Sequence, residues 1–141
     1  MKALRSIALG SCLLFAAAAA HAQGITLRAN IPFNFAVGDQ ALPAGEYVVQ
    51  PAGAGWATLI IRSCSDTSKA ASAITYASGG GNPTHKTQLV FHRVGQKYFL
   101  SQIQVEGDSL GRQLTKSRAE AELASNQDVN NAVVLAEAVT R

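Results

Sequence analysis

The chain is poor in the residues that build covalent staples or strongly charged surfaces. It has two cysteines in 141 residues, 6% aromatic residues and 15% charged residues. We expect Cys12 to leave with an N-terminal leader, so Cys64 is alone in the mature chain and no internal disulfide forms. We interpret Cys64 as a small, partly buried residue near a strand end. A reactive thiol and a bridge between two chains are the alternatives.

The N-terminus has the three parts of a secretory signal peptide, which we place at residues 1–22. Lys2 and Arg5 precede an apolar stretch from Ile7 to Ala20, and Ala20-His21-Ala22 fits the small-x-small cleavage pattern. The sequence therefore predicts an exported protein, periplasmic or extracellular, with residues 23–141 forming a single β-rich domain.

Two other interpretations of the leader fit less well. The apolar stretch is shorter than the roughly 20 residues of a membrane-spanning helix, so we expect no stable span after cleavage. Leu9-Gly10-Ser11-Cys12 loosely resembles a lipidation motif, but the apolar run follows Cys12 instead of preceding it.

The mature chain has almost no net charge. Without Lys2 and Arg5, ten basic residues face nine acidic ones, which gives about +1. These charges are scattered along the sequence, so no cationic patch indicates a nucleic-acid partner. The basic isoelectric point belongs largely to the leader.

Alternating apolar residues predict a strand between Ile25 and Val37. Pro32 has no N–H to donate, so we expect two shorter strands that turn a corner. Three further β-prone segments follow in the chain: Glu46–Gln50, which we expect Pro51 to stop, Trp56–Arg62 and Ile74–Tyr76.

The second half of the chain predicts a hairpin and then a helix. Lys86–Val94 and Gln96–Val105 flank Gly95, and residues 106–111 form a polar turn. Ser117-Arg118-Ala119-Glu120 has the spacing of a capping box and predicts a helix from about Lys116 to Asn126. Val133–Ala136 is either a last strand or the middle of a short helix.

Together these segments predict a mainly β fold, an antiparallel β-barrel or β-sandwich with one short helix near the C-terminus. Around the start of that helix, we expect Arg112, Arg118 and Glu120 to pair.

Several segments resemble a known family in their order along the chain. They are Ile31-Pro32-Phe33-Asn34-Phe35, Gly38-Asp39, Leu42-Pro43-Ala44-Gly45-Glu46-Tyr47, Leu89–Arg93 with Tyr98–Ser101, Gly111–Leu114 and Ser117–Glu120. This pattern covers most of Ile31 to Leu123 and is similar to small exported bacterial proteins of unknown function. The resemblance implies a β-rich fold and an envelope location, but no activity and no catalytic residues.

No motif predicts a reaction, a metal or a cofactor. His85 and His92 have no serine, cysteine or carboxylate at a signature spacing, and a metal would need further ligands from elsewhere. If Lys86–Val94 is a strand, His92 faces away from Leu89 and Phe91, toward solvent or a cavity. The glycine-rich segment 79–83 lacks the Lys-Ser/Thr pair of a P-loop, so we interpret it as an exposed loop.

Three functional hypotheses remain. The first is a non-enzymatic structural or protein-interaction domain of the envelope. An enzyme whose site is not visible in the sequence is another. The remaining hypothesis is a small barrel that binds a hydrophobic or amphipathic ligand. Candidates for lining its cavity are Tyr47, Trp56, Tyr76, Phe91 and Tyr98, although the same aromatics would also serve as core.

Overall fold

The computed structural model describes residues 25–53, 55–80 and 82–139. The predicted signal peptide lies outside these residues. The described part contains ten strands and one helix in the order β1 (Thr26–Ile31), β2 (Phe35–Val37), β3 (Gln40–Leu42), β4 (Gly45–Gly53), β5 (Gly55–Ser63), β6 (Ala70–Gly79), β7 (Gln88–Val94), β8 (Lys97–Gln104), β9 (Leu110–Leu114), α1 (Arg118–Ala124) and β10 (Val129–Val139).

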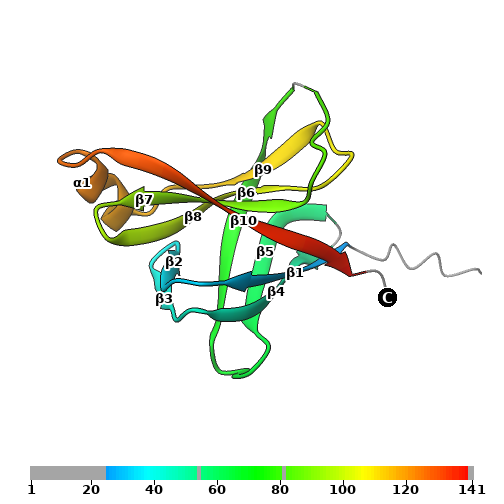
Figure 1. The fold of residues 1–141 in the computed structure, drawn as a ribbon, viewed down its shortest axis with the longest axis horizontal. Coiled ribbons are helices and arrows are strands. Elements are labelled where there is room, and N and C mark those ends of the chain that lie inside the picture. Colours follow the sequence, from blue (N-terminus) through cyan, green and yellow to red (C-terminus); the bar gives the residue numbers. More distant parts are fainter. Residues whose placement is uncertain (1–24, 54, 81, 140–141) are drawn as a thin grey trace, which may run out of the picture.

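Eight of these strands close into an antiparallel β-barrel (Figure 1). The order around the barrel is β8-β7-β10-β1-β4-β5-β6-β9, and closure comes from the pairing of β8 with β9 at Gln102↔Gln113 and Ile103↔Arg112. β2 and β3 form a small hairpin outside this ring, joined to β8 through one parallel pair, Ala36↔Phe99. The prediction of a mainly β fold is confirmed, and the structure selects the barrel over the sandwich.

The long strands β6 and β10 each pair with one neighbour along their first half and with another along their second half (Figure 1). The first half of β6 pairs with β5 and its second half with β9. Likewise, β10 pairs with β7 from Val129 to Leu135 and with β1 from Ala136 to Val139. A strand that changes partner bends between two sheets, so the sheets separate near each change.

The alternating residues between Ile25 and Val37 form two strands, β1 and β2, with the predicted corner between them. β1 buries Leu27, Ala29 and Ile31, and β2 resumes at Phe35 after a break that contains Pro32. The proline therefore stands between the strands, where its missing N–H interrupts no ladder. This prediction is confirmed.

The expectation at Pro51 is wrong, because β4 continues through it to Gly53. Pro51 is opposite Leu59 on β5, and the register shifts between Pro51 and Gly53. Such irregularities tolerate proline because the ladder is already disrupted there.

The polar turn predicted at residues 106–111 is shorter than expected, since β9 begins at Leu110. The sequence of β9, Leu-Gly-Arg-Gln-Leu, has little β character. Pairing with β6 on one side and with β8 on the other keeps this strand extended. The ambiguity at Val133–Ala136 resolves as a strand, β10, because Val133, Val134 and Leu135 pair with β7 and Ala136 pairs with β1.

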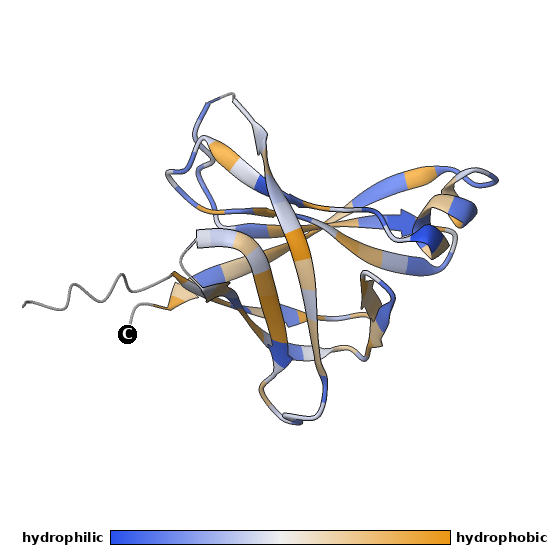
Figure 2. Ribbon diagram, turned by 180° about the vertical axis from the view of Figure 1, so that it is seen from behind, coloured by the Kyte–Doolittle hydropathy of each residue, from blue (hydrophilic) through white to orange (hydrophobic). Residues whose placement is uncertain are grey.

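The barrel interior is filled by a single cluster of buried apolar side chains. The fully buried members include Leu27, Ile31, Tyr47, Leu59 and Phe91, and the alternation of apolar residues along the strands is visible in Figure 2. At one end of the interior, Phe33 stacks on Tyr98 with ring centroids 3.8 Å apart and meets Phe91 edge-on at 5.0 Å. The interior is thus packed with side chains.

Helix α1 confirms the predicted capping box in part. The Ser117 hydroxyl accepts a hydrogen bond from the Glu120 backbone N–H at 3.1 Å. The Glu120 side chain, however, extends to the barrel. No helix among residues 25–53, 55–80 and 82–139 combines the length and apolar character of a membrane span.

Candidate functional site

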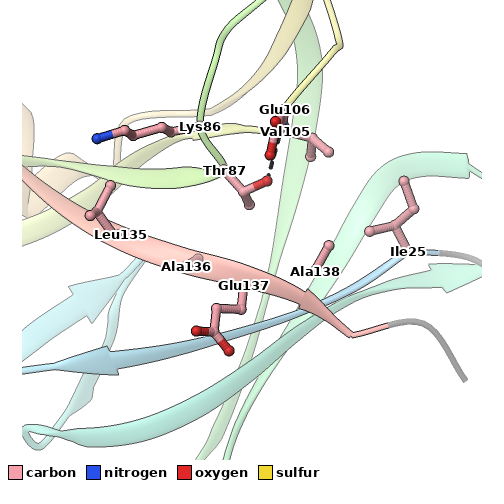
Figure 3. A pocket seen from close by; sticks show the side chains of 9 residues that line it. All are labelled: Ile25, Lys86, Thr87, Val105, Glu106, Leu135, Ala136, Glu137 and Ala138. Carbon is pink, nitrogen blue, oxygen red and sulfur yellow. Dashed lines mark hydrogen bonds between the residues drawn. The ribbon is translucent and has the colours of Figure 1, made fainter.

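A pocket of about 730 Å³ opens beside the point where β10 changes partner (Figure 3). Its lining residues are Ile25, Lys86, Thr87, Val105, Glu106, Leu135, Ala136, Glu137 and Ala138. They come from the segment before β1, from the approach to β7, from the segment after β8 and from the second half of β10. The pocket exists because β7 and β1 diverge on either side of this strand.

Hydrogen bonds fix the polar wall of the pocket. The Ala136 N–H donates to the Thr87 carbonyl at 3.0 Å, and the Thr87 hydroxyl accepts from the Glu106 N–H at 3.1 Å. Thr87 is only 7% exposed, so this wall has a defined shape. From Ala136 onward, β10 pairs with β1 along one edge, and no described strand pairs with the other edge, which faced β7 up to Leu135.

The pocket combines apolar walls with charges at the rim. Ile25, Val105 and Ala138 face the opening in Figure 3, whereas the Lys86 ammonium extends away from them. Glu106 places a carboxylate at the same opening, whereas the Glu137 side chain leaves β10 on the side opposite to Ala138. The site therefore suits a molecule with an apolar body and a polar end.

The five aromatic residues predicted to line a cavity do not gather at this pocket. Tyr47 and Phe91 are fully buried in the core, Trp56 and Tyr98 are partly buried against it, and Tyr76 is 49% exposed. Tyr47 donates a 2.6 Å hydrogen bond to the Pro43 carbonyl. Burial raises the pKa of the Tyr47 phenol, with Asp66 adding a smaller repulsive effect.

A second cluster joins three elements on the outer side of the barrel. His92 of β7 places Nδ1 2.7 Å from Glu120 Oε1 of α1, and its Nε2 lies 2.9 Å from Ser101 Oγ of β8. The Glu120 and His92 side chains are 6% and 19% exposed, and Ser101 is 6% exposed. The cluster has the connectivity of a serine, a base and an orienting carboxylate.

This cluster revises two expectations. His92 does face away from the buried Leu89 and Phe91, but it meets protein groups instead of solvent or a cavity. Glu120 pairs with His92, while Arg118 pairs with Glu122 one turn along the helix at 2.8 Å. The three members lie far apart in sequence, so no local spacing marks them.

The two remaining candidates have simpler surroundings. Cys64 is a free thiol that directly follows β5 and is exposed, so the expectation of partial burial is wrong. His85 is exposed in the segment before β7. Within the part of the chain that the structure describes, no three His, Cys, Asp or Glu side chains are grouped as for a metal ion.

Comparisons with known proteins add no further assignment. No family model, no curated protein and no solved structure matches the chain. The resemblance to small exported bacterial proteins stays a prediction from the motifs quoted above.

Proposed function

We propose that this chain is an exported envelope protein whose barrel binds a small amphipathic molecule in the pocket beside β10. The observation that carries the proposal is the pocket itself, about 730 Å³ with apolar walls and a charged rim. Sites for small molecules usually measure about 300 to 1,000 Å³ and combine apolar surface with a few polar groups. The leader at residues 1–22 supports the exported location.

The rim carries one charge of each sign. Glu106 contributes a carboxylate and Lys86 an ammonium group. An alkyl chain against Ile25, Val105 and Ala138 would leave its polar head near these two groups. The packed interior supports this lateral site over a ligand inside the barrel.

Calorimetric titration with two single-chain probes tests the proposal. Decylammonium and decanoate, each below its micelle-forming concentration, are added to the mature chain. We expect saturable binding of at least one probe at one copy per chain, and the difference between the two affinities reports which rim charge the head group meets. Ala138→Trp fills the pocket and should weaken binding at least tenfold. Ala41→Trp adds the same side chain at another exposed alanine, on β3, and should change nothing.

Two outcomes would reject this proposal. One is the absence of saturable binding by either probe to the folded wild-type chain. The other is equal affinity in the wild type and in Ala138→Trp, because a probe in the pocket cannot ignore an indole placed there. A thermal unfolding curve of each variant confirms that the compared chains are folded.

The structural or protein-interaction role is the second candidate, and exposed apolar residues on β10 favour it. Val133 is 54% exposed and Leu135 59% exposed. They lie two positions apart on one face of the strand, which suits a contact with a second copy of the chain. Sedimentation velocity of the wild type and of Val133→Asp separates the cases. A dimer that Val133→Asp dissociates supports this role, and a wild-type monomer at high concentration rejects self-association.

A further inference from the structure

An irregularity in the β7–β8 pairing brings Ser101 to the outer side of the barrel. Val90 is opposite Gln102, and the next residue, Phe91, is opposite Leu100, which leaves Ser101 as the extra residue of a β-bulge. A bulge changes which face the following side chains occupy. Leu100 and Ile103 are both buried in the core cluster, and Ser101 between them lies beside His92 on the other face.

The hydrogen bonds of His92 define the roles of its two nitrogens. An ionised Glu120 carboxylate only accepts hydrogen bonds, so the nitrogen that faces it, Nδ1, carries the proton. In the neutral imidazole, Nε2 is then the acceptor and receives the Ser101 hydroxyl at 2.9 Å. Ser101, His92 and Glu120 thus stand in the relation of nucleophile, general base and positioning carboxylate.

Glu120 is held in place by its helix. Its backbone N–H donates to the Ser117 hydroxyl, which caps the first turn of α1 and fixes the position of Glu120 in that turn. The carboxylate is buried at 6% exposure and therefore has little freedom to leave His92. A base held in one orientation needs less rearrangement to take a proton from its neighbour.

The burial of the cluster limits what can reach it. Ser101 is 6% exposed and the His92 side chain 19%, so an approaching molecule meets the imidazole edge and little of the serine. Such limited access disfavours a long chain or a peptide, so any acyl group that reaches the serine must be short. The cluster is separate from the pocket, because His92 lies near the end of β7 and the pocket residue Thr87 precedes its start.

We propose that Ser101 is a nucleophilic serine that accepts short acyl groups from activated esters, with His92 as its general base. Ser101 Oγ forms a bond to the acyl carbon while His92 Nε2 takes the hydroxyl proton. The ester C–O bond then breaks, and the leaving alcohol takes that proton from His92. Water, activated by the same nitrogen, releases the carboxylic acid and restores the serine. This activity is independent of amphiphile binding at the pocket.

Covalent labelling of the full mature chain tests the assignment. An excess of a small fluorophosphonate or of p-nitrophenyl acetate is added, and intact-mass and peptide mass spectrometry locate the adduct. We expect one adduct on Ser101 of the wild type and none on Ser101→Ala. Ser78→Ala is the matched control, because Ser78 also bonds a side chain, Gln113, but has no histidine partner. It should label like the wild type.

A pH profile distinguishes the positioning role of Glu120 from a purely structural one. The labelling rate of the wild type should depend on pH, because a general base must be free of the proton it is to accept. Glu120→Gln should slow labelling at least tenfold at the pH optimum, and Glu120→Asp should recover part of that loss.

Three outcomes would overturn the proposal. They are an unlabelled Ser101 in the folded wild type, an adduct at another residue only, and labelling of Ser101 at a rate independent of pH and of Glu120. In each case the cluster would be a polar clamp that fastens α1 to the barrel. Because the adduct is mapped on the wild-type chain, these outcomes stand even if a variant fails to fold.

Discussion

Tyr47 and Pro43 are joined by a 2.6 Å hydrogen bond from a fully buried phenol to a backbone carbonyl four residues earlier. The phenol oxygen would otherwise be a polar group at the edge of the core, and Phe35 packs edge-on against the same ring at 5.1 Å. The bond therefore fixes the segment between β3 and β4 to the core.

Tyr47→Phe should lower the free energy of unfolding by about 1 kcal/mol, because it removes one hydrogen bond and leaves the Pro43 carbonyl without this donor. Urea unfolding at neutral pH measures the change. Tyr76→Phe is the control, since Tyr76 is half exposed and should alter stability by less than about 0.5 kcal/mol. Equal effects of the two substitutions would contradict the importance of the Tyr47 bond.

The burial of Tyr47 should also make the stability of the chain depend on alkaline pH. Burial raises the pKa of Tyr47 above its ordinary value of 10.0, so the folded chain disfavours the phenolate. The resulting stability is complete below pH 10.0 and is lost as the pH rises, because the unfolded chain ionises first. Urea unfolding at rising pH should show a steeper loss in the wild type than in Tyr47→Phe. Parallel curves would contradict the pKa shift.

The turn between β7 and β8 depends on glycine for two reasons. Gly95 has φ of +63°, and an added Cβ would collide with the side chain of Gln127. Gly38, in the turn between β2 and β3, has φ of +59° but open space around it. Gly38→Ala should therefore lower the free energy of unfolding by about 1 to 2 kcal/mol through backbone strain alone. Gly95→Ala should lower it by more, because the collision with Gln127 adds to the strain.

A double substitution separates the two contributions at Gly95. Gln127→Ala removes the colliding side chain, so in that background Gly95→Ala should cost about as much as Gly38→Ala. Thermal unfolding of the wild type, the two single variants and the double variant gives the coupling free energy between positions 95 and 127. A cost at Gly95 that is unchanged by Gln127→Ala would show that the side chain moves aside freely.

Two glutamates on α1 should differ sharply in their contribution to stability. Glu120 is buried and pairs with His92, whereas Glu122 is 65% exposed and pairs with an exposed Arg118. Glu120→Ala should cost about 2 kcal/mol, in the range of hydrogen bonds to charged groups. Glu122→Ala should cost at most about 0.5 kcal/mol. Chemical unfolding of both variants checks the contrast, and similar losses would refute it.

The features predicted correctly from the sequence are those that neighbouring residues determine. The alternation in β1 and β2, the break near Pro32 and the hairpin around Gly95 each follow from side-chain periodicity or turn chemistry within a few residues. The cap at Ser117 is equally local. Each of these elements carries its own signal, so each was accessible without a structure.

The features that were missed depend on distant partners. β9 is extended because β6 and β8 flank it, and barrel closure requires Gln102 to meet Gln113. The Ser101–His92–Glu120 cluster needs a bulge, a hairpin and a helix to coincide. The pocket likewise results from the change of partner along β10. No single segment contains these relationships, and periodicity alone cannot express them.

The pairing of β10 with both β1 and β7 ties the completion of the fold to the order of synthesis. Thr26 meets Val139, so the first and last described strands must come together before the ring is complete. A chain that has emerged only as far as β9 leaves the edges of β1 and β7 open and remains unfinished.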